Sequence, residues 1–168
     1  MDIHNVMMTE IQELHDAENQ FAQALGFLYE KADDGDLRKA LADHRTETTE
    51  HARRLEQICS HMGWQPVGKQ SMVARALVED TKKTLQNAMP SPTTDAIIIG
   101  AAQKAEHFEM ASYGTVAAIA DAMDRDFAKE LLGKTLDEEK DADKLLTKIA
   151  MHRINKDAVR HSGRATVI

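Results

Sequence analysis

The chain has 168 residues but only one cysteine, Cys59, so no disulfide can form within it. Turn-forming and aromatic residues are also scarce, with three prolines, eight glycines and 4% aromatics. Sheet proteins depend on such residues, whereas this composition is typical of an all-helical protein. A hydrophobic share of 42% over this length is enough to close one core, so we expect a single domain.

Three further absences narrow the class of protein. No apolar run approaches the roughly 18 residues that a membrane-spanning helix needs. Residues 1–5 show no basic segment followed by an apolar run, so they do not resemble a secretory signal. The formal charge of -7 repels a phosphate backbone. We therefore expect a cytoplasmic protein that binds neither membranes nor nucleic acid.

Four long segments carry apolar residues at alternating steps of three and four, the spacing of one helix face. The helices that this spacing predicts lie near residues 3–32, 36–62, 94–122 and 125–152. The connection between the second and third, with a shorter helix near 71–88, is too long for a hairpin turn. We expect it to run back along a bundle, so that the third long helix is parallel to the second. The prediction is an all-α four-helix bundle with a crossover helix over 1–154 and a basic, disordered tail over 155–168.

Acidic side chains interrupt these apolar faces near the middle of the helices. Glu18 is the only acid on the first face, and Glu106 and Glu109 lie one turn apart on the third. Burying a carboxylate costs several kcal/mol unless it is paired, protonated or bound to metal. Counting from the turn of each hairpin places acids of all four helices, and His51, at a similar height. The same count places His44 roughly 9 Å away from Glu18 along the axis, which makes it a poorer ligand candidate.

Carboxylates and imidazoles that converge on one point are ligands that suit iron or manganese. Helical bundles that bind two such ions take a Glu from each of two helices and a Glu-x-x-His from each of the other two, a pattern that this sequence fits in part. We expect two divalent ions, iron or manganese, held by these residues: Glu18, Glu47, His51, Glu106, Glu109, Glu139 and Asp143. Glu138 lies one position off the fourth face and is expected to take no part.

The segments that carry a family resemblance are 16–20 (Asp-Ala-Glu-Asn-Gln), 44–56 (beginning His-x-x-Glu-Thr), 101–115 (with Glu106, His107 and Glu109) and 135–143 (Thr-Leu-Asp-Glu-Glu-Lys-x-x-Asp). They resemble the YciE/YciF-type stress proteins of the ferritin-like superfamily, over nearly the whole chain. The resemblance implies a ferritin-like bundle, a bacterial stress setting, a homodimer and a di-metal centre. It does not imply a particular reaction.

Three hypotheses of function stay open at this point. The first is a metal-dependent oxidoreductase whose substrate is a small oxidant, peroxide or dioxygen. The second is iron binding or storage with ferroxidase activity, and the third is a structural bundle whose acids are paired internally. Two further side chains have open roles. His107 is expected at an inter-helix or subunit contact, and Tyr113 either packs in the core or supports the site.

Overall fold

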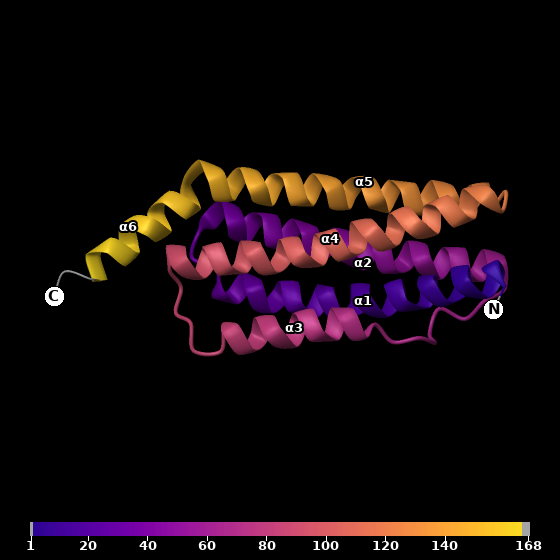
Figure 1. The fold of residues 1–168 in the computed structure, drawn as a ribbon, viewed down its shortest axis with the longest axis horizontal. Coiled ribbons are helices and arrows are strands. Elements are labelled where there is room, and N and C mark those ends of the chain that lie inside the picture. Colours follow the sequence, from indigo (N-terminus) through magenta and orange to yellow (C-terminus); the bar gives the residue numbers. More distant parts are fainter. Residues whose placement is uncertain (1, 166–168) are drawn as a thin grey trace.

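The computed structural model describes residues 2–165 and contains helices only within that range (Figure 1). Its elements are α1 (Ile3–Lys31), α2 (Gly35–Met62), α3 (Met72–Thr84), α4 (Pro92–Ala122), α5 (Asp126–Ile149), a π-helical turn η1 (Ala150–Ile154) and α6 (Asn155–Ala165). The predicted all-α class, the four long helices and the short crossover helix are confirmed. No helix in this part of the chain is both long and apolar enough to cross a membrane.

Helices α1, α2, α4 and α5 form the bundle, with α1–α2 and α4–α5 as its two hairpins (Figure 1). Helix α3 lies along the outside of α1 and α4 and returns the chain to the end at which α2 begins. Consequently α4 runs parallel to α2, as the length of the crossover predicts. The remaining neighbours are α1–α4 and α2–α5, so each bundle helix is antiparallel to both helices beside it.

Short polar side chains fix where the helices begin. Asp34 caps α2 by accepting from the backbone N–H groups of Asp36 and Leu37. The carboxylate of Asp95, buried in α4, accepts from the N–H groups of Asp33 and Asp34 at 2.8 and 3.0 Å. These bonds satisfy donors that a helical hairpin leaves free, and they tie the α1–α2 turn to the second hairpin.

The apolar core is divided into two large clusters, one toward each end of the bundle. One contains Leu28, Leu41 and Ile98, and the other contains Ile11 and Ile58 among further buried residues. Burying one such side chain fully contributes about 1.5–3 kcal/mol, so these two clusters hold the four helices together. The layer between them is polar, and it contains the candidate site.

The C-terminal segment differs from the disordered tail predicted for 155–168. Residues 155–165 form α6, which continues from η1, and the last three residues lie outside the described range. Ile154 is buried in one of the core clusters, and Arg153 forms an ion pair with Asp34 at the α1–α2 turn. These tertiary contacts hold the start of α6, which the polar composition of the segment does not reveal.

Candidate metal centre

The middle layer of the bundle brings together four buried carboxylates and two buried imidazoles. Every helix of the bundle contributes at least one of them, and none is more than 8% exposed. They are Glu18 from α1, His44 and His51 from α2, Glu106 and Glu109 from α4, and Glu139 from α5.

Five of these side chains, all except Glu109, form two overlapping groups, Glu18–His51–Glu139 and His44–Glu106–Glu139. Within each group the facing ligand atoms lie within 4.8 Å of one another. Donors on opposite sides of an ion with bonds of about 2.1 Å are separated by about 4.2 Å, so each group has the dimensions of one metal site. Glu139 belongs to both groups and would be a ligand common to both sites.

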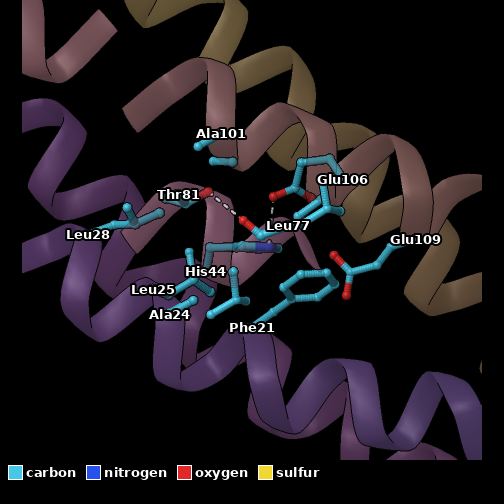
Figure 2. A pocket seen from close by; sticks show the side chains of 13 residues that line it. Phe21, Ala24, Leu25, Leu28, His44, Leu77, Thr81, Ala101, Glu106 and Glu109 are labelled. Carbon is cyan, nitrogen blue, oxygen red and sulfur yellow. Dashed lines mark hydrogen bonds and ion pairs between the residues drawn. The ribbon is translucent and has the colours of Figure 1, made fainter. Parts of the chain in front are cut away.

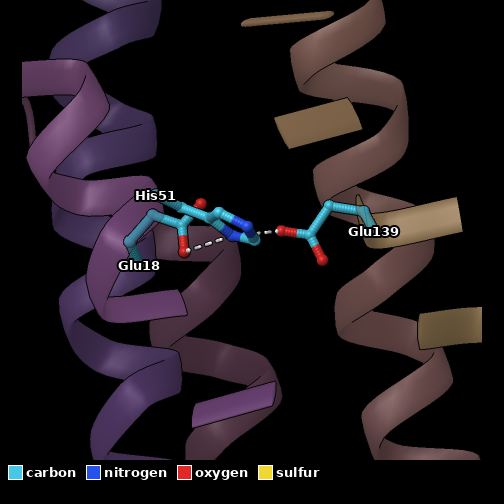
Figure 3. Close-up of side chains that lie close together, drawn as sticks. All are labelled: Glu18, His51 and Glu139. Atoms are coloured by element: carbon cyan, nitrogen blue, oxygen red, sulfur yellow. Dashed lines mark ion pairs between the residues drawn. The ribbon is translucent and has the colours of Figure 1, made fainter. Parts of the chain in front are cut away.

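The two carboxylate oxygens of Glu139 face different histidines. Oε1 lies 2.8 Å from Nδ1 of His51, and Oε2 lies 3.5 Å from Nε2 of His44. Figure 3 shows Glu139 reaching from α5 toward the His51 ring, with Glu18 on the other side of that ring. Nε2 of His44 is also 3.2 Å from Oε1 of Glu106, which completes the second group.

Several atoms at the centre of the cluster lack a hydrogen-bond partner among the described residues. They are Oε2 of Glu18, Nδ1 of His51, Oε2 of Glu106, Oε1 of Glu109 and both carboxylate oxygens of Glu139. His51 Nδ1 and Glu139 Oε1 form an ion pair when the imidazole is protonated, but they are not aligned as a hydrogen bond. Each unpartnered buried polar group costs about 1–3 kcal/mol. Metal ions bound at these atoms would remove that cost, so the residues fit a metal centre.

Each histidine also contacts a second carboxylate through the ring nitrogen that faces away from the cluster. The Nδ1 atom of His44 lies 3.3 Å from Glu47, and Nε2 of His51 lies 2.9 Å from Glu138. Glu138 is itself held by the guanidinium of Arg54. Carboxylates in this position orient metal-binding imidazoles and make them better ligands. They leave Nε2 of His44 and Nδ1 of His51 directed at the cluster.

The imidazoles bind protons tightly when no metal ion is bound. Burial alone would lower the pKa of His51, but the carboxylates of Glu139 and Glu18 outweigh it and raise that pKa to about 10. Burial likewise acts to lower the pKa of His44, and its contacts with Glu106 and Glu47 raise it well above the usual value. A metal ion that binds either ring nitrogen must therefore displace a proton.

Burial also raises the pKa of three carboxyls in the cluster, those of Glu18, Glu109 and Glu139. The carboxyl of Glu109 has a pKa well above its ordinary value because it is buried and because its neighbours Glu139, Glu18 and Glu106 carry the same charge. Burial raises the pKa of Tyr113 as well, so its hydroxyl stays protonated and donates to Oε1 of Glu18. Tyr113 thus packs in the core and contacts the cluster, which combines its two expected roles.

Five of the seven ligands predicted from the sequence lie in the cluster: Glu18, His51, Glu106, Glu109 and Glu139. The structure does not bring Glu47 and Asp143 to its centre. The side chain of Glu47 is half exposed behind His44, while Asp143 accepts from Gln103 at 2.9 Å. Asp143 also lies 3.4 Å from Nε2 of His107, which is the inter-helix contact expected for that histidine.

Two residues that the sequence analysis set aside do contact the site. His44 lies seven positions before His51, which is about 10 Å along a helix, yet their ring centroids are 6.3 Å apart. Both rings are directed toward the carboxylate of Glu139. A count of helical rise gives the height of the backbone only and does not predict the direction of a side chain. Glu138 contacts His51 although it lies off the apolar face, because it sits between that ring and Arg54. In the sequence, only its position next to Glu139 indicates that Glu138 lies near the site.

Two cavities reach the cluster from different sides. The first lies between α1, α3 and α4, is mostly apolar, and ends at His44, Glu106 and Glu109 (Figure 2). The second lies between α2 and α5, has a volume of about 250 Å³, and also reaches His44 and Glu106. Its outer part is acidic, with the side chains of Asp43, Glu47, Glu138 and Asp141.

The fold and the site together define a ferritin-like helical bundle with a buried Glu/His cluster. Residues 2–159 match the model of the DUF892 family, described as a domain of unknown function, and the chain belongs to that family. Protein YciF of Escherichia coli K12 is 32% identical over 157 residues, which cover 93% of this chain and 95% of that protein. The resemblance inferred from the sequence motifs is thereby confirmed.

Solved structures support the same relationship. The crystal structure of the E. coli stress protein YciF matches with a TM-score of 0.87 and 31% identity, over 92% of this chain and 98% of that one. YcfI from Rhodopseudomonas palustris, provisionally described as a structural protein, matches with a TM-score of 0.84 and 29% identity, over 88% of this chain and 94% of its own.

Proposed function

We propose that this protein is a di-metal carboxylate protein, with iron or manganese, that acts on peroxide or dioxygen. The observation that carries the proposal is Glu139, whose two buried oxygens accept no hydrogen bond and belong to two adjacent Glu/His groups. Four carboxylates and two imidazoles are also the ligand complement of bundles that bind two such ions. Here both imidazoles come from α2 instead of from two different helices.

The residues that would hold the ions are the six buried side chains of the cluster, with Glu139 shared. A pair of such ions supplies two-electron chemistry with small oxygen species, which protein side chains do not provide. The chain supplies the surroundings. The apolar clusters on either side cover the site along the bundle axis, Glu47 and Glu138 orient the imidazoles, and the Tyr113 hydroxyl holds a proton at Oε1 of Glu18.

The setting of this function follows from the relatives. E. coli YciF is called a stress protein, and removal of an oxidant is a reaction that a stressed cell needs. We extend that setting to this chain, and with it a cytoplasmic location and assembly as a homodimer. Light scattering tests the assembly, because a dimer differs from the large cage that an iron store would form.

The test is a metal count on the purified, chelator-treated chain after anaerobic addition of ferrous iron or manganese(II). The two groups predict a distinct stoichiometry for each variant, because Gln keeps the shape of Glu and removes its charge. Glu18→Gln should lose the ion beside His51, Glu106→Gln should lose the other, and Glu139→Gln should lose both. Glu130, exposed on α5, gives the matched control Glu130→Gln, which should keep two.

Two results would contradict the proposal. One is a wild-type chain that takes up no metal, and the other is equal metal content in all the variants. The first result would favour a structural bundle, the description given to YcfI, in which protonated histidines neutralise part of the acidic charge. A large cage with metal at the same residues would favour iron storage.

A further inference from the structure

The apolar cavity beneath α3 ends at the candidate metal centre. Its inner end is formed by His44, Glu106 and Glu109, and its outer wall includes Leu77 of α3 (Figure 2). We propose that this cavity is the binding site of the oxidant, a neutral molecule of two heavy atoms such as dioxygen or hydrogen peroxide, and that it excludes organic hydroperoxides. The inference rests on the proposed di-metal function and specifies which oxidants this cavity can admit to that centre.

The size of the cavity sets the first limit. It gives the centre of a water-sized molecule about 30 Å³ in which to move. One water needs roughly 10–15 Å³ by this measure, so the space suits a molecule of about two heavy atoms. A hydroperoxide with a branched alkyl group cannot enter unless the walls move.

The chemistry of the walls sets the second limit. The side chains outside the inner end are apolar apart from Thr81, whose hydroxyl already donates to the carbonyl oxygen of Leu77 at 2.7 Å. An anion would lose its hydration without gaining a donor, and it would meet the carboxylates of Glu106 and Glu109. Dioxygen avoids both costs, and hydrogen peroxide can offset its lost hydration by donating its O–H groups to these carboxylates. The acidic cavity between α2 and α5 has the opposite character and suits cations.

The wall contributed by α3 limits how large a ligand the cavity admits. Ala74 is the one fully buried residue of that helix, whereas Leu77 is half-buried and packs with Phe21 and Ala105 in a small separate cluster. Leu77 of α3 and Ala105 of α4 both line the cavity. Side-chain size at these two positions should therefore control access without altering a metal ligand.

The experiment compares two variants that change the cavity in opposite directions. Ala105→Val adds methyl groups inside it, and Leu77→Ala removes them from its outer wall. Metal-loaded protein is mixed with hydrogen peroxide, with dioxygen, or with tert-butyl hydroperoxide, and the rate of metal oxidation is followed optically. We expect wild type to react at least about 100-fold more slowly with tert-butyl hydroperoxide than with hydrogen peroxide, since a few methyl groups carry discrimination of this order. Leu77→Ala should reduce the difference between the two peroxide rates at least about tenfold. Ala105→Val should slow metal oxidation by hydrogen peroxide and by dioxygen.

The control is Val73→Ala, because Val73 lies on α3 but is exposed and does not line the cavity. This variant should keep the wild-type ratio. A readout independent of the metal is xenon, which binds dry apolar cavities and can be located in pressurised crystals of the full chain. We expect a xenon atom beside Leu77 in wild type and none in Ala105→Val.

Each outcome bears on the proposal. If Ala105→Val slows metal oxidation by just one of the two small oxidants, that oxidant is the ligand of the cavity. Equal rates for both peroxides in metal-loaded wild type, or unchanged rates in both cavity variants, would overturn the inference and leave the metal centre standing. A chain that takes up no metal would overturn the proposed function and this inference together, whatever the xenon result.

Discussion

The metal-free protein should lose stability when the pH rises from 7 to 8.5, because the folded cluster keeps a proton that the unfolded chain releases. His51 has a pKa of 6.5 when unperturbed and about 10 in the folded state. Its contribution to stability is therefore fully present below pH 6.5 and declines until the pH reaches about 10. Within this interval each pH unit costs about 1.4 kcal/mol in the free energy of unfolding.

Integrating between the two pH values gives a loss of about 2 kcal/mol for His51 alone. For a chain of this size, 1 kcal/mol corresponds to a change of about 2–4 °C, so the unfolding temperature should fall by roughly 4–8 °C. His44, whose pKa is also raised, contributes in the same direction. The lowered pKa of Glu138 has the opposite sign, but it acts only below its ordinary value of 4.5 and so outside this interval.

The assay is thermal unfolding followed by circular dichroism on chelator-treated protein at both pH values. His51→Gln should show a smaller pH dependence than wild type, whatever its absolute stability. Metal-loaded protein should show little pH dependence, because the ions displace the protons concerned. An unfolding temperature that stays constant or rises with pH in the metal-free wild type would refute the reasoning.

Below pH 7, the raised pKa of Glu109 predicts a further gain in stability of the metal-free protein as the pH falls toward 5.

Three further predictions concern residues around the cluster. Glu138→Gln should weaken metal binding about 10–100-fold in a competition titration, since it removes the carboxylate that orients an imidazole ligand. Asp141→Asn should slow metal uptake in stopped-flow experiments at low salt and leave the final metal content unchanged, whereas Asp137→Asn, outside the acidic cavity, should have no effect. Tyr113→Phe should destabilise metal-free protein by about 1–3 kcal/mol in urea unfolding, because Glu18 loses a buried donor.

Much of the fold could be predicted because its signals are local and periodic. The three-and-four spacing that includes Ile11 and Leu28 identifies the buried faces, and the length of the crossover determines the direction of α4. Helix α6 could not be predicted, because tertiary contacts made by Ile154 and Arg153 hold its start. The local sequence pattern of that segment does not predict those contacts.

The candidate site could be predicted only where a side chain lies on a buried face. Glu18 and Glu139 interrupt apolar positions, and so the sequence identifies them. Height along the helix was a poorer guide, because the flexible side chains of an acid or histidine span several ångströms. For this reason the side chain of His44 reaches the cluster although its backbone lies at a different height. Glu47 lies nearer the height predicted for the site, but its half-exposed side chain contacts His44 on the side away from the cluster.

Glu109 separates the metal-binding hypothesis from the structural one. In a bundle that only pairs its acids internally, each buried carboxylate should have a cationic or donor partner. Glu18 and Glu139 lie beside histidines, but Glu109 has a buried, unpartnered oxygen and no ion pair among the described residues. The charged groups that act on it are three other glutamates. An apolar residue at this position would usually be as stable or more stable, so packing does not account for the carboxylate. A cation bound beside it would account for it, which is why we include Glu109 among the proposed metal ligands.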